Sequence, residues 1–212
     1  MAIGPRIRKL IGPFEKPVSE IYRSIFVDLK VLRHQIEEWI PPAAGSQILE
    51  VGCGEGAIIE LLADIFPTAQ ITGIDITPRI GRLFKGDLRR VSFRKQTIKD
   101  FSSENYGRFD LVVINDVLHH IAPEMHKEFL RDTQKSLKKG GVLLLKDWKR
   151  SKTPIHIFSF LMERYITGDK VCYLSSDELR GLLIDVFGAA CIKDEASIPP
   201  WENNIAFLVK ND

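Results

Sequence analysis

The 212-residue chain contains few cysteines, and no pair of them has the spacing of a metal or redox motif. Cys53, Cys172 and Cys191 are odd in number and far apart, so neither a C-x-x-C site nor a disulfide framework is expected. This usage of cysteine fits a reducing compartment. We therefore expect a cytoplasmic protein.

Long apolar runs are also missing. No stretch approaches the roughly 20 residues needed to span a bilayer, and Met1–Arg6 lacks the apolar segment of a signal peptide. The sequence therefore predicts no integral membrane segment. Internal repeats and low-complexity segments are absent too, and the length suits about one domain with a substantial core.

An excess of charge of one sign is the third absence. The formal net charge is +2, so bulk electrostatics give no argument for a nucleic-acid partner. Residues 1–17 nevertheless carry four basic side chains among glycines and prolines. We interpret them as a loose basic arm, either a solvated tail or a segment attracted to an acidic substrate or an anionic membrane surface. Peripheral membrane contact and the oligomeric state stay open.

What the chain does contain is a glycine-rich turn between an apolar run and a helix. Ile48–Val51 is typical of a short buried strand, Ala57–Leu62 of a helix start, and three alternate glycines lie within Gly52–Gly56. Such glycines let the backbone approach a ligand closely, and free amides at the helix start add a favourable dipole. Asp75 ends the next apolar run, where its carboxylate can accept hydrogen bonds from ribose hydroxyls. The pattern predicts a cofactor that contains a nucleoside.

Glu50 distinguishes between nucleoside cofactors. Its carboxylate lies two residues before Gly52, next to the place where the pyrophosphate of NAD would bind, and like charges there would repel. The same carboxylate suits a ligand that carries an ammonium and a sulfonium group. NAD is therefore disfavoured.

The segment Glu50–Gly56, EVGCGEG, resembles motif I of the class I S-adenosylmethionine (SAM) methyltransferases, E/D-x-G-x-G-x-G, of the small-molecule type. Phe109–Ile121 is similar to the fourth strand and following turn of that family, F-D-x-V-x-x-x-x-x-L-H-H. Leu137–Leu145 resembles its L-x-P-G-G turn and fifth strand, with Lys139 where proline is usual. The similarities follow one another in order from residue 46 to residue 147. The resemblance implies a methyltransferase with SAM as its cofactor.

The alternation of strands and helices, together with this resemblance, predicts an α/β fold. We expect a Rossmann-like, seven-stranded, mostly parallel sheet with an antiparallel C-terminal hairpin and helices on both faces. The expected strands are Ile48–Val51, Gln70–Asp75, Val91–Gln96, Leu111–Asn115, Val142–Lys146, Cys191–Ala196 and Asn204–Lys210. The expected helices are Ser19–Ile40, Ile58–Phe66, Arg79–Lys85, Pro123–Lys138 and one that a capping box opens at Ser175 and that ends at Phe187. Residues 1–40 would form the arm and a cap helix, and residues 41–212 the SAM-binding domain, with a lid insertion at about 148–174.

The resemblance implies a role for each residue of the glycine turn. Glu50 would lie near the methionine amino group of SAM. Gly52 and Gly54 would allow the close backbone approach, with Cys53 as a small filler between them, and Gly56 would serve helix packing instead. Asp75 would bind the ribose.

Adenine and the rest of the methionine would meet the neighbouring strand ends. Ile76 would pack on the adenine face, and Thr97 with Ile98 stands where the family often has an acid that meets the adenine amino group; Asp100 is the alternative. Asn115 would meet the methionine part of SAM. Asp116 would contact the cofactor or the substrate, or cap the helix that follows. No metal site is predicted.

The reaction implied is in-line attack of a nucleophile on the methyl group of SAM. A general base is needed only for a nucleophile that enters protonated. His119 and His120 follow the fourth strand and are the candidate bases, of which at most one is expected to face the substrate; a structural role is the alternative. Asp147 is a second acid at the rim of the site.

Substrate choice is expected to lie in the insertion Trp148–Leu174, which is rich in aromatic and apolar residues. The candidate substrate residues are Tyr22, Trp148, His156 and Tyr165. Core packing explains part of this composition, and the rest suggests a small, apolar or aromatic acceptor. The acceptor atom is left open among oxygen, nitrogen, carbon and sulfur. A protein or RNA methyltransferase and a non-catalytic partner subunit that binds SAM or S-adenosylhomocysteine are the alternative functions.

Overall fold

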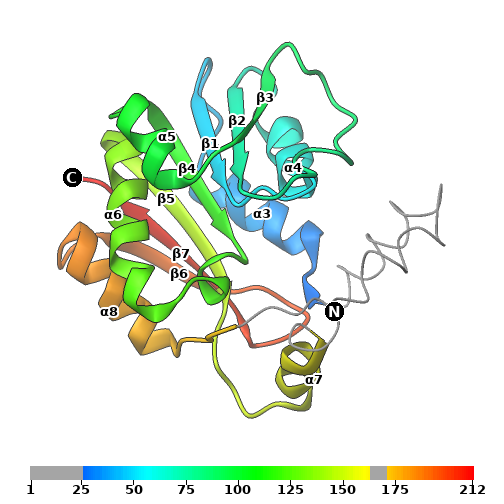
Figure 1. Ribbon diagram of the computed structural model, residues 1–212, viewed down its shortest axis with the longest axis vertical. Coiled ribbons are helices and arrows are strands. Elements are labelled where there is room, and N and C mark those ends of the chain that lie inside the picture. Colours follow the sequence, from blue (N-terminus) through cyan, green and yellow to red (C-terminus); the bar gives the residue numbers. More distant parts are fainter. Residues whose placement is uncertain (1–25, 163–170) are drawn as a thin grey trace.

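The computed structural model describes residues 26–162 and 171–212, and a seven-stranded sheet is its centre (Figure 1). The strands lie in the order β3-β2-β1-β4-β5-β7-β6. Strands β1 to β5 pair in parallel, whereas β7 runs antiparallel to both of its neighbours, β5 and β6. The strands are β1 (Gln47–Val51), β2 (Gln70–Asp75), β3 (Val91–Lys95), β4 (Phe109–Asn115), β5 (Leu137–Trp148), β6 (Ile192–Ser197) and β7 (Asn204–Lys210).

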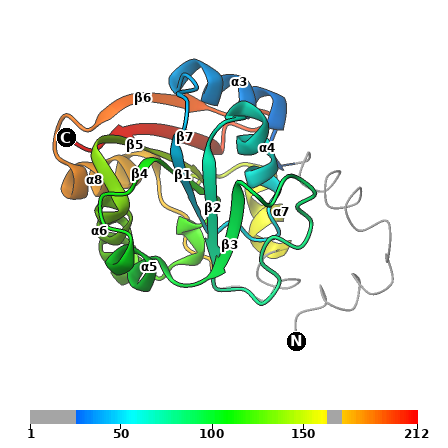
Figure 2. The ribbon, with the colours of Figure 1, turned by 90° about the horizontal axis from the view of Figure 1, so that it is seen from above.

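Helices cover both faces of the sheet, as the view from above shows (Figure 2). On one face lie α5 (Ile98–Glu104), α6 (His126–Ser136) and α8 (Ser176–Phe187), and on the other α3 (Leu29–Trp39) and α4 (Ala57–Ile65). The helix α7 (Pro154–Met162) follows β5, and two short 3-10 helices, η2 (Leu118–His120) and η3 (Pro123–Met125), follow β4. The sheet architecture predicted from the sequence is confirmed, including the reversed last strand.

Two cores result from the alternation of side chains along the strands. Leu49 and Val51 of β1 point to the face with α5, α6 and α8, whereas Ile48 points to the face with α3 and α4. Because both faces are covered, β4 is apolar and buried over most of its length rather than alternating with polar residues.

The structure corrects two of the expected helices. In the described part of Ser19–Ile40, the helix α3 begins only at Leu29, because the Asp28 carboxylate accepts hydrogen bonds from the amides of Lys30 and Val31 and caps it there. Residues 19–25 of that segment lie outside the described residues. The short helix expected at Arg79–Lys85 is wrong: the chain forms turns.

Two further boundaries differ from the sequence prediction. Helix α5 was not predicted, although Thr97 accepts a hydrogen bond from the amide of Asp100 and caps it. The helix expected to reach Lys138 ends at Ser136, because Leu137 already pairs with Phe109 in the sheet. Elsewhere the predicted strands match within a few residues, and the capping box at Ser175 is present.

The parallel order brings the carboxyl ends of β1 to β5 to one edge of the sheet, where ligands bind in open α/β folds. Across the described ranges, no helix combines the length and the apolar character that crossing a bilayer requires.

Candidate functional site

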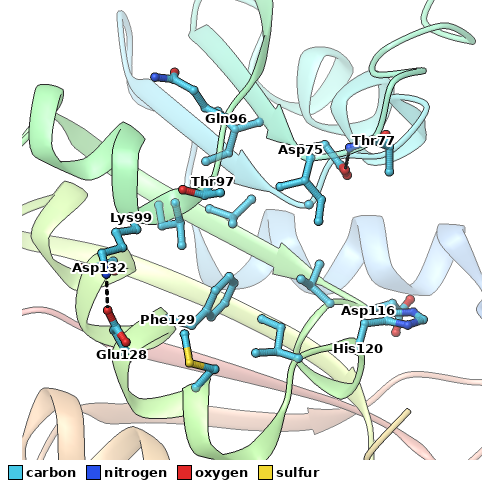
Figure 3. Close-up of a pocket in the computed structure, with 18 residues that line it drawn as sticks. Asp75, Thr77, Gln96, Thr97, Lys99, Asp116, His120, Glu128, Phe129 and Asp132 are labelled. Atoms are coloured by element: carbon cyan, nitrogen blue, oxygen red, sulfur yellow. Dashed lines mark hydrogen bonds and ion pairs between the residues drawn. The ribbon is translucent and has the colours of Figure 1, made fainter. Parts of the chain in front are cut away.

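A cavity of about 880 Å³ lies at the carboxyl ends of β1 to β4, a size typical of small-molecule sites. Asp75 and Thr77 lie on one side of it, and Asp116 and His120 lie on another (Figure 3). Of the residues predicted to contact the cofactor or to act as the base, those that line it are Gly52, Asp75, Ile76, Thr97, Ile98, Asp116 and His120.

The glycine turn after β1 is shaped by close contacts. Gly52 has a φ of +77°, and a Cβ there would lie 2.3 Å from Cγ2 of Val117, so the turn after β4 leaves no room for a side chain. Gly54 has a φ of +49°, but a Cβ there would meet no atom within 4 Å. A Cβ at Gly56 would lie 3.1 Å from Cβ of Phe84. Gly52 and Gly56 are thus needed for packing, and Gly54 only for its backbone conformation.

Four backbone amides of this turn donate hydrogen bonds within the protein. Gly52 and Cys53 both donate to the carbonyl of Ile74, at 2.8 and 3.1 Å, and Gly56 donates to the carbonyl of Cys53 at 2.9 Å. The amide of Gly54 donates to Asp75. The turn therefore offers a ligand a rigid, close surface and few hydrogen-bond donors.

Asp75 is the fixed acid at the tip of β2. Its two carboxylate oxygens accept hydrogen bonds from the amides of Gly54 at 2.7 Å and Thr77 at 2.8 Å. Each oxygen keeps a further lone pair with which it can accept a hydrogen bond from a hydroxyl group. The neighbouring Ile76 is 69% exposed and forms part of the cavity wall, where a flat apolar group can cover it.

The end of β3 differs in detail from the expectation. The Thr97 hydroxyl accepts from the amide of Asp100 at 3.2 Å and donates to its carboxylate at 2.8 Å. Thr97 and Asp100 are thereby engaged with each other as the cap of α5. The cavity wall continues along the first turn of α5, at Ile98 and Lys99.

Four residues predicted to contact the cofactor do not line the cavity, namely Glu50, Cys53, Gly54 and Asn115. Glu50 is only 2% exposed, and Cys53 is buried. Burial, together with the Glu50 and Asp75 carboxylates, raises the pKa of the Cys53 thiol, so it stays protonated. The side-chain amide of Asn115 donates to Asp116 at 3.0 Å.

Asp116 is held in an unusual conformation by a buried lysine. Among the described residues it is the one non-glycine residue with a positive φ, +55°. Lys146 of β5 places its Nζ atom 2.6 and 2.7 Å from the two Asp116 oxygens, and this lysine is only 1% exposed. The sequence analysis missed Lys146. A lone charge at the end of the apolar run Val142–Leu145 was the available signal.

His119 and Asp147 form a second buried pair. The Nδ1 atom of His119 contacts Oδ1 of Asp147 in a short hydrogen bond. Asp147 also accepts from the backbone amides of His119, at 3.2 Å, and Trp148, at 2.7 Å. Burial would raise the pKa of the Asp147 carboxyl, but His119, the Trp148 amide and the Lys146 charge outweigh it, and the pKa lies below its ordinary value.

Aromatic rings continue from this pair. The His119 ring lies 4.2 Å from the ring of His120 on one side and stacks at 5.2 Å on the ring of Tyr173 on the other. The His156 ring contacts Tyr173 at 4.6 Å. The sequence analysis did not single out Tyr173 as a site residue, because its contact with His119 depends on how the chain returns after α7.

The other candidate substrate residues have different positions. Trp148 is 5% exposed, and its ring meets that of Phe26 at 5.7 Å. His156 is buried as well, so neither lines the cavity described above. Tyr22 and Tyr165 lie outside the described residues.

Comparison with known proteins fits this architecture. A family model described as "Methyltransferase domain" matches residues 25–192. A ubiquinone biosynthesis O-methyltransferase of Xanthomonas campestris pv. campestris is 32% identical over 111 residues, which cover 50% of this chain and 45% of that protein. The corresponding protein of Xanthomonas oryzae pv. oryzae is 33% identical over 112 residues, with 51% and 45% covered. The match thus spans about half the length of these curated relatives.

Solved structures share the fold at low sequence identity. The SAM-dependent methyltransferase SibL has a TM-score of 0.70 at 17% identity, with 96% of this chain and 60% of that chain covered. The 1,6-didemethyltoxoflavin-N1-methyltransferase of Burkholderia thailandensis, solved with S-adenosylhomocysteine, has a TM-score of 0.61 at 15% identity, with 92% and 89% covered. The cavity has a size that suits SAM, and the family match covers most of the chain. The chain therefore belongs to the methyltransferase-domain family, and its fold is that of SAM-dependent methyltransferases of known structure.

Proposed function

We propose that this protein methylates a hydroxyl oxygen of a small, apolar or aromatic molecule, with His119 as the general base. The observation that carries the proposal is the buried His119–Asp147 pair beside the cofactor cavity. When bound, SAM supplies a methyl group on a sulfonium, which is already activated toward a nucleophile. The protein must then position the acceptor, exclude water and remove the hydroxyl proton.

The tautomer of His119 follows from its partner. The pKa of Asp147 is low, so its carboxylate is ionised and can only accept hydrogen bonds. The Nδ1 atom of His119 must therefore carry the hydrogen in their contact. In a neutral imidazole the basic lone pair then lies on Nε2, which is the atom that we assign to proton removal.

His120 has a different part in the proposal. It lines the cavity, which His119 does not, and its ring lies 4.2 Å from that of His119 at a tilt of 40°. We assign it to the wall between cofactor and acceptor. Comparing His119→Gln with His120→Gln tests this division, because loss of the base should cost far more turnover than loss of a wall residue.

The aromatic side chains near the pair support the acceptor class. Phe26 meets Trp148 edge-on at 5.7 Å and stacks with Phe158 of α7 at 6.5 Å, and Tyr173 covers His119. Trp148 and Tyr173 are buried, whereas Phe158 is 47% exposed and gives this cluster an apolar face that suits a flat or apolar molecule. The curated relatives are O-methyltransferases by name, which also favours oxygen as the acceptor atom. In the same proposal, residues 1–40 are the arm and cap helix, residues 41–212 are the SAM-binding domain, and the insertion of that domain at about 148–174 acts as a lid.

The proposal also assigns SAM to the cavity. The Asp75 carboxylate would accept the ribose hydroxyls, and Ile76 and Ile98 would enclose adenine. We also propose a cytoplasmic setting, because Cys53, Cys172 and Cys191 lack the spacing of a disulfide framework.

Two measurements test the function. Calorimetric titration with SAM, S-adenosylhomocysteine and NAD should show binding of the first two only. Incubation with SAM and a panel of phenols, with S-adenosylhomocysteine measured by chromatography, should show turnover that His119→Gln abolishes. Binding of S-adenosylhomocysteine without turnover on any acceptor would instead support a non-catalytic partner subunit. Turnover on thiols or amines alone would refute oxygen as the acceptor atom.

A further inference from the structure

The acceptor end of the site has the composition of a divalent-cation site. Asp116, His119 and Asp147 each offer a ligand atom, and these atoms lie within 4.8 Å of one another. Two carboxylates and an imidazole are ligands that Zn²⁺, Mn²⁺ and Fe²⁺ accept. All three residues stand at the carboxyl ends of β4 and β5 or in the turn that follows β4.

A cation is already built into this cluster. The Nζ atom of Lys146 contacts both oxygens of Asp116, at 2.6 and 2.7 Å, and its charge also contributes to the low pKa of Asp147. In the described ranges, the hydrogen bonds found for this Nζ go to Asp116 alone. A buried ammonium is costly without a carboxylate partner, so Lys146 has a strong reason to stay where it is.

The Asp147 carboxylate is engaged as well. His119 directs Nδ1 to Asp147, and Asp147 in turn accepts two backbone amides. A metal ion would have to displace the Lys146 ammonium from Asp116 and displace a hydrogen-bond donor from Asp147. Both displacements oppose metal binding, and the first would leave a buried charge unpaired.

We propose that the Lys146 ammonium takes the place of a divalent metal ion in the acceptor site, so that methyl transfer by this protein needs no metal. Lys146 is thus a positioning residue: it neutralises Asp116 and fixes the left-handed turn that leads from β4 to His119 and His120.

The inference also predicts which acceptors the protein can use, and this prediction rests on the proposed function. A metal ion holds an acceptor best through two adjacent oxygens, because they chelate it. A lysine that is fully engaged with Asp116 offers no such chelation. A compound with one ionisable hydroxyl should therefore be as good an acceptor as its analogue with two adjacent hydroxyls.

The test compares Mn²⁺ binding by three forms of the protein. Binding is measured as the loss of the electron paramagnetic resonance signal of free Mn²⁺. The forms are the wild type, Lys146→Met and Lys138→Met. Lys138 is a matched control because it lies on the same strand and pairs with Asp110 at 2.7 Å, but it is 44% exposed and does not line the cavity.

The wild type and Lys138→Met should leave the free Mn²⁺ signal unchanged. Lys146→Met should bind Mn²⁺ about a hundred-fold or more tightly than the wild type, because a positive charge next to the ligands is gone. Adding Asp116→Asn to Lys146→Met should remove that binding. Wild-type activity, where it is found, should be unchanged after dialysis against EDTA.

Stoichiometric Mn²⁺ binding by the wild type that Asp116→Asn abolishes would overturn the inference. A folded Lys146→Met variant that gains no Mn²⁺ affinity would do the same. If Lys146→Met fails to fold, the wild-type measurements with and without Asp116→Asn decide the question. The metal readout does not depend on turnover, so failure of this inference and failure of the proposed methylation can be told apart.

Discussion

Replacing Asp147 by asparagine removes one charge from the site and little volume. The carboxylate contacts Nδ1 of His119 and accepts two backbone amides, and the asparagine oxygen can replace only part of this. Two charges about 4 Å apart interact by about 4 kcal/mol at an effective dielectric constant of about 20. Each 1.4 kcal/mol or so corresponds to a factor of ten in rate. Because the amide dipole keeps part of the interaction, we expect kcat to fall by about 10²- to 10³-fold.

The pH dependence of kcat should also change, and the direction of the change follows from the charge of Asp147. A carboxylate beside an imidazole stabilises the protonated form of the ring. In Asp147→Asn the base should therefore lose its proton at lower pH, and the acidic limb of the kcat profile should move to lower pH while its plateau drops. The calorimetric affinity for S-adenosylhomocysteine should stay within a few-fold of the wild type.

The matched control is Asp110→Asn, which breaks the ion pair with Lys138 at 2.7 Å and does not touch the cavity. It should leave kcat and the pH profile unchanged. The reasoning about the base is refuted if Asp147→Asn keeps wild-type turnover. It is also refuted if kcat falls without any movement of the acidic limb, because that result would indicate a structural role for the pair.

Four further predictions address the cofactor site and stability. Asp75→Ala should weaken S-adenosylhomocysteine binding by about a hundred-fold or more in calorimetry, since a carboxylate that accepts hydroxyls is lost; normal binding would contradict the assigned ribose contact. Gly52→Ala should also lose binding of S-adenosylhomocysteine, because the new Cβ would lie 2.3 Å from Cγ2 of Val117. Adding Val117→Ala should restore part of the affinity, since this clash is relieved while the strain of a positive φ remains. Equal affinities of the single and double variants would exclude the clash as the cause. His120→Ala should spare binding and lower turnover about tenfold, and a kcat equal to that of the wild type would remove His120 from the acceptor wall. The pKa of Asp147 is lowered in the folded state, so this carboxylate contributes to the free energy of unfolding above about pH 4, and the contribution is lost as the pH falls further. In urea titrations, the free energy of unfolding of Asp147→Asn should therefore depend less on pH below about pH 4 than that of the wild type. Parallel pH dependences of the two proteins would count against the buried ion pair.

Local spacing made the positions of the glycine turn and of Asp75 at the cavity predictable. The glycines, Asp75 and the reversed last strand follow from patterns within one strand–turn–helix unit or one hairpin, and the backbone has few ways to satisfy them. The hydrogen bonds from the turn amides to Ile74 and Asp75 could not be predicted in this way, because they join the turn to the neighbouring strand.

The acceptor side could not be predicted in the same way. The contacts of Lys146 with Asp116 and of Tyr173 with His119 join residues that are far apart in the sequence, and they depend on the register between β4 and β5 and on the path after α7. The sequence analysis named Asp147 only as an acid at the rim, because no local pattern shows that a carboxylate will meet an imidazole from another strand.

The position of β7 has a consequence for the order in which the chain folds during synthesis. In the sheet β6 has β7 as its one partner strand, and β7 lies between β6 and β5. Strand β6 therefore has nothing to pair with until Asn204–Lys210 has left the ribosome. Strands β1 to β4, by contrast, can pair much earlier, because their partners precede them or follow closely along the chain. A nascent chain would thus complete first the half of the sheet that lines the cavity, and the edge of β5 would stay open to chaperones until β7 has been synthesised.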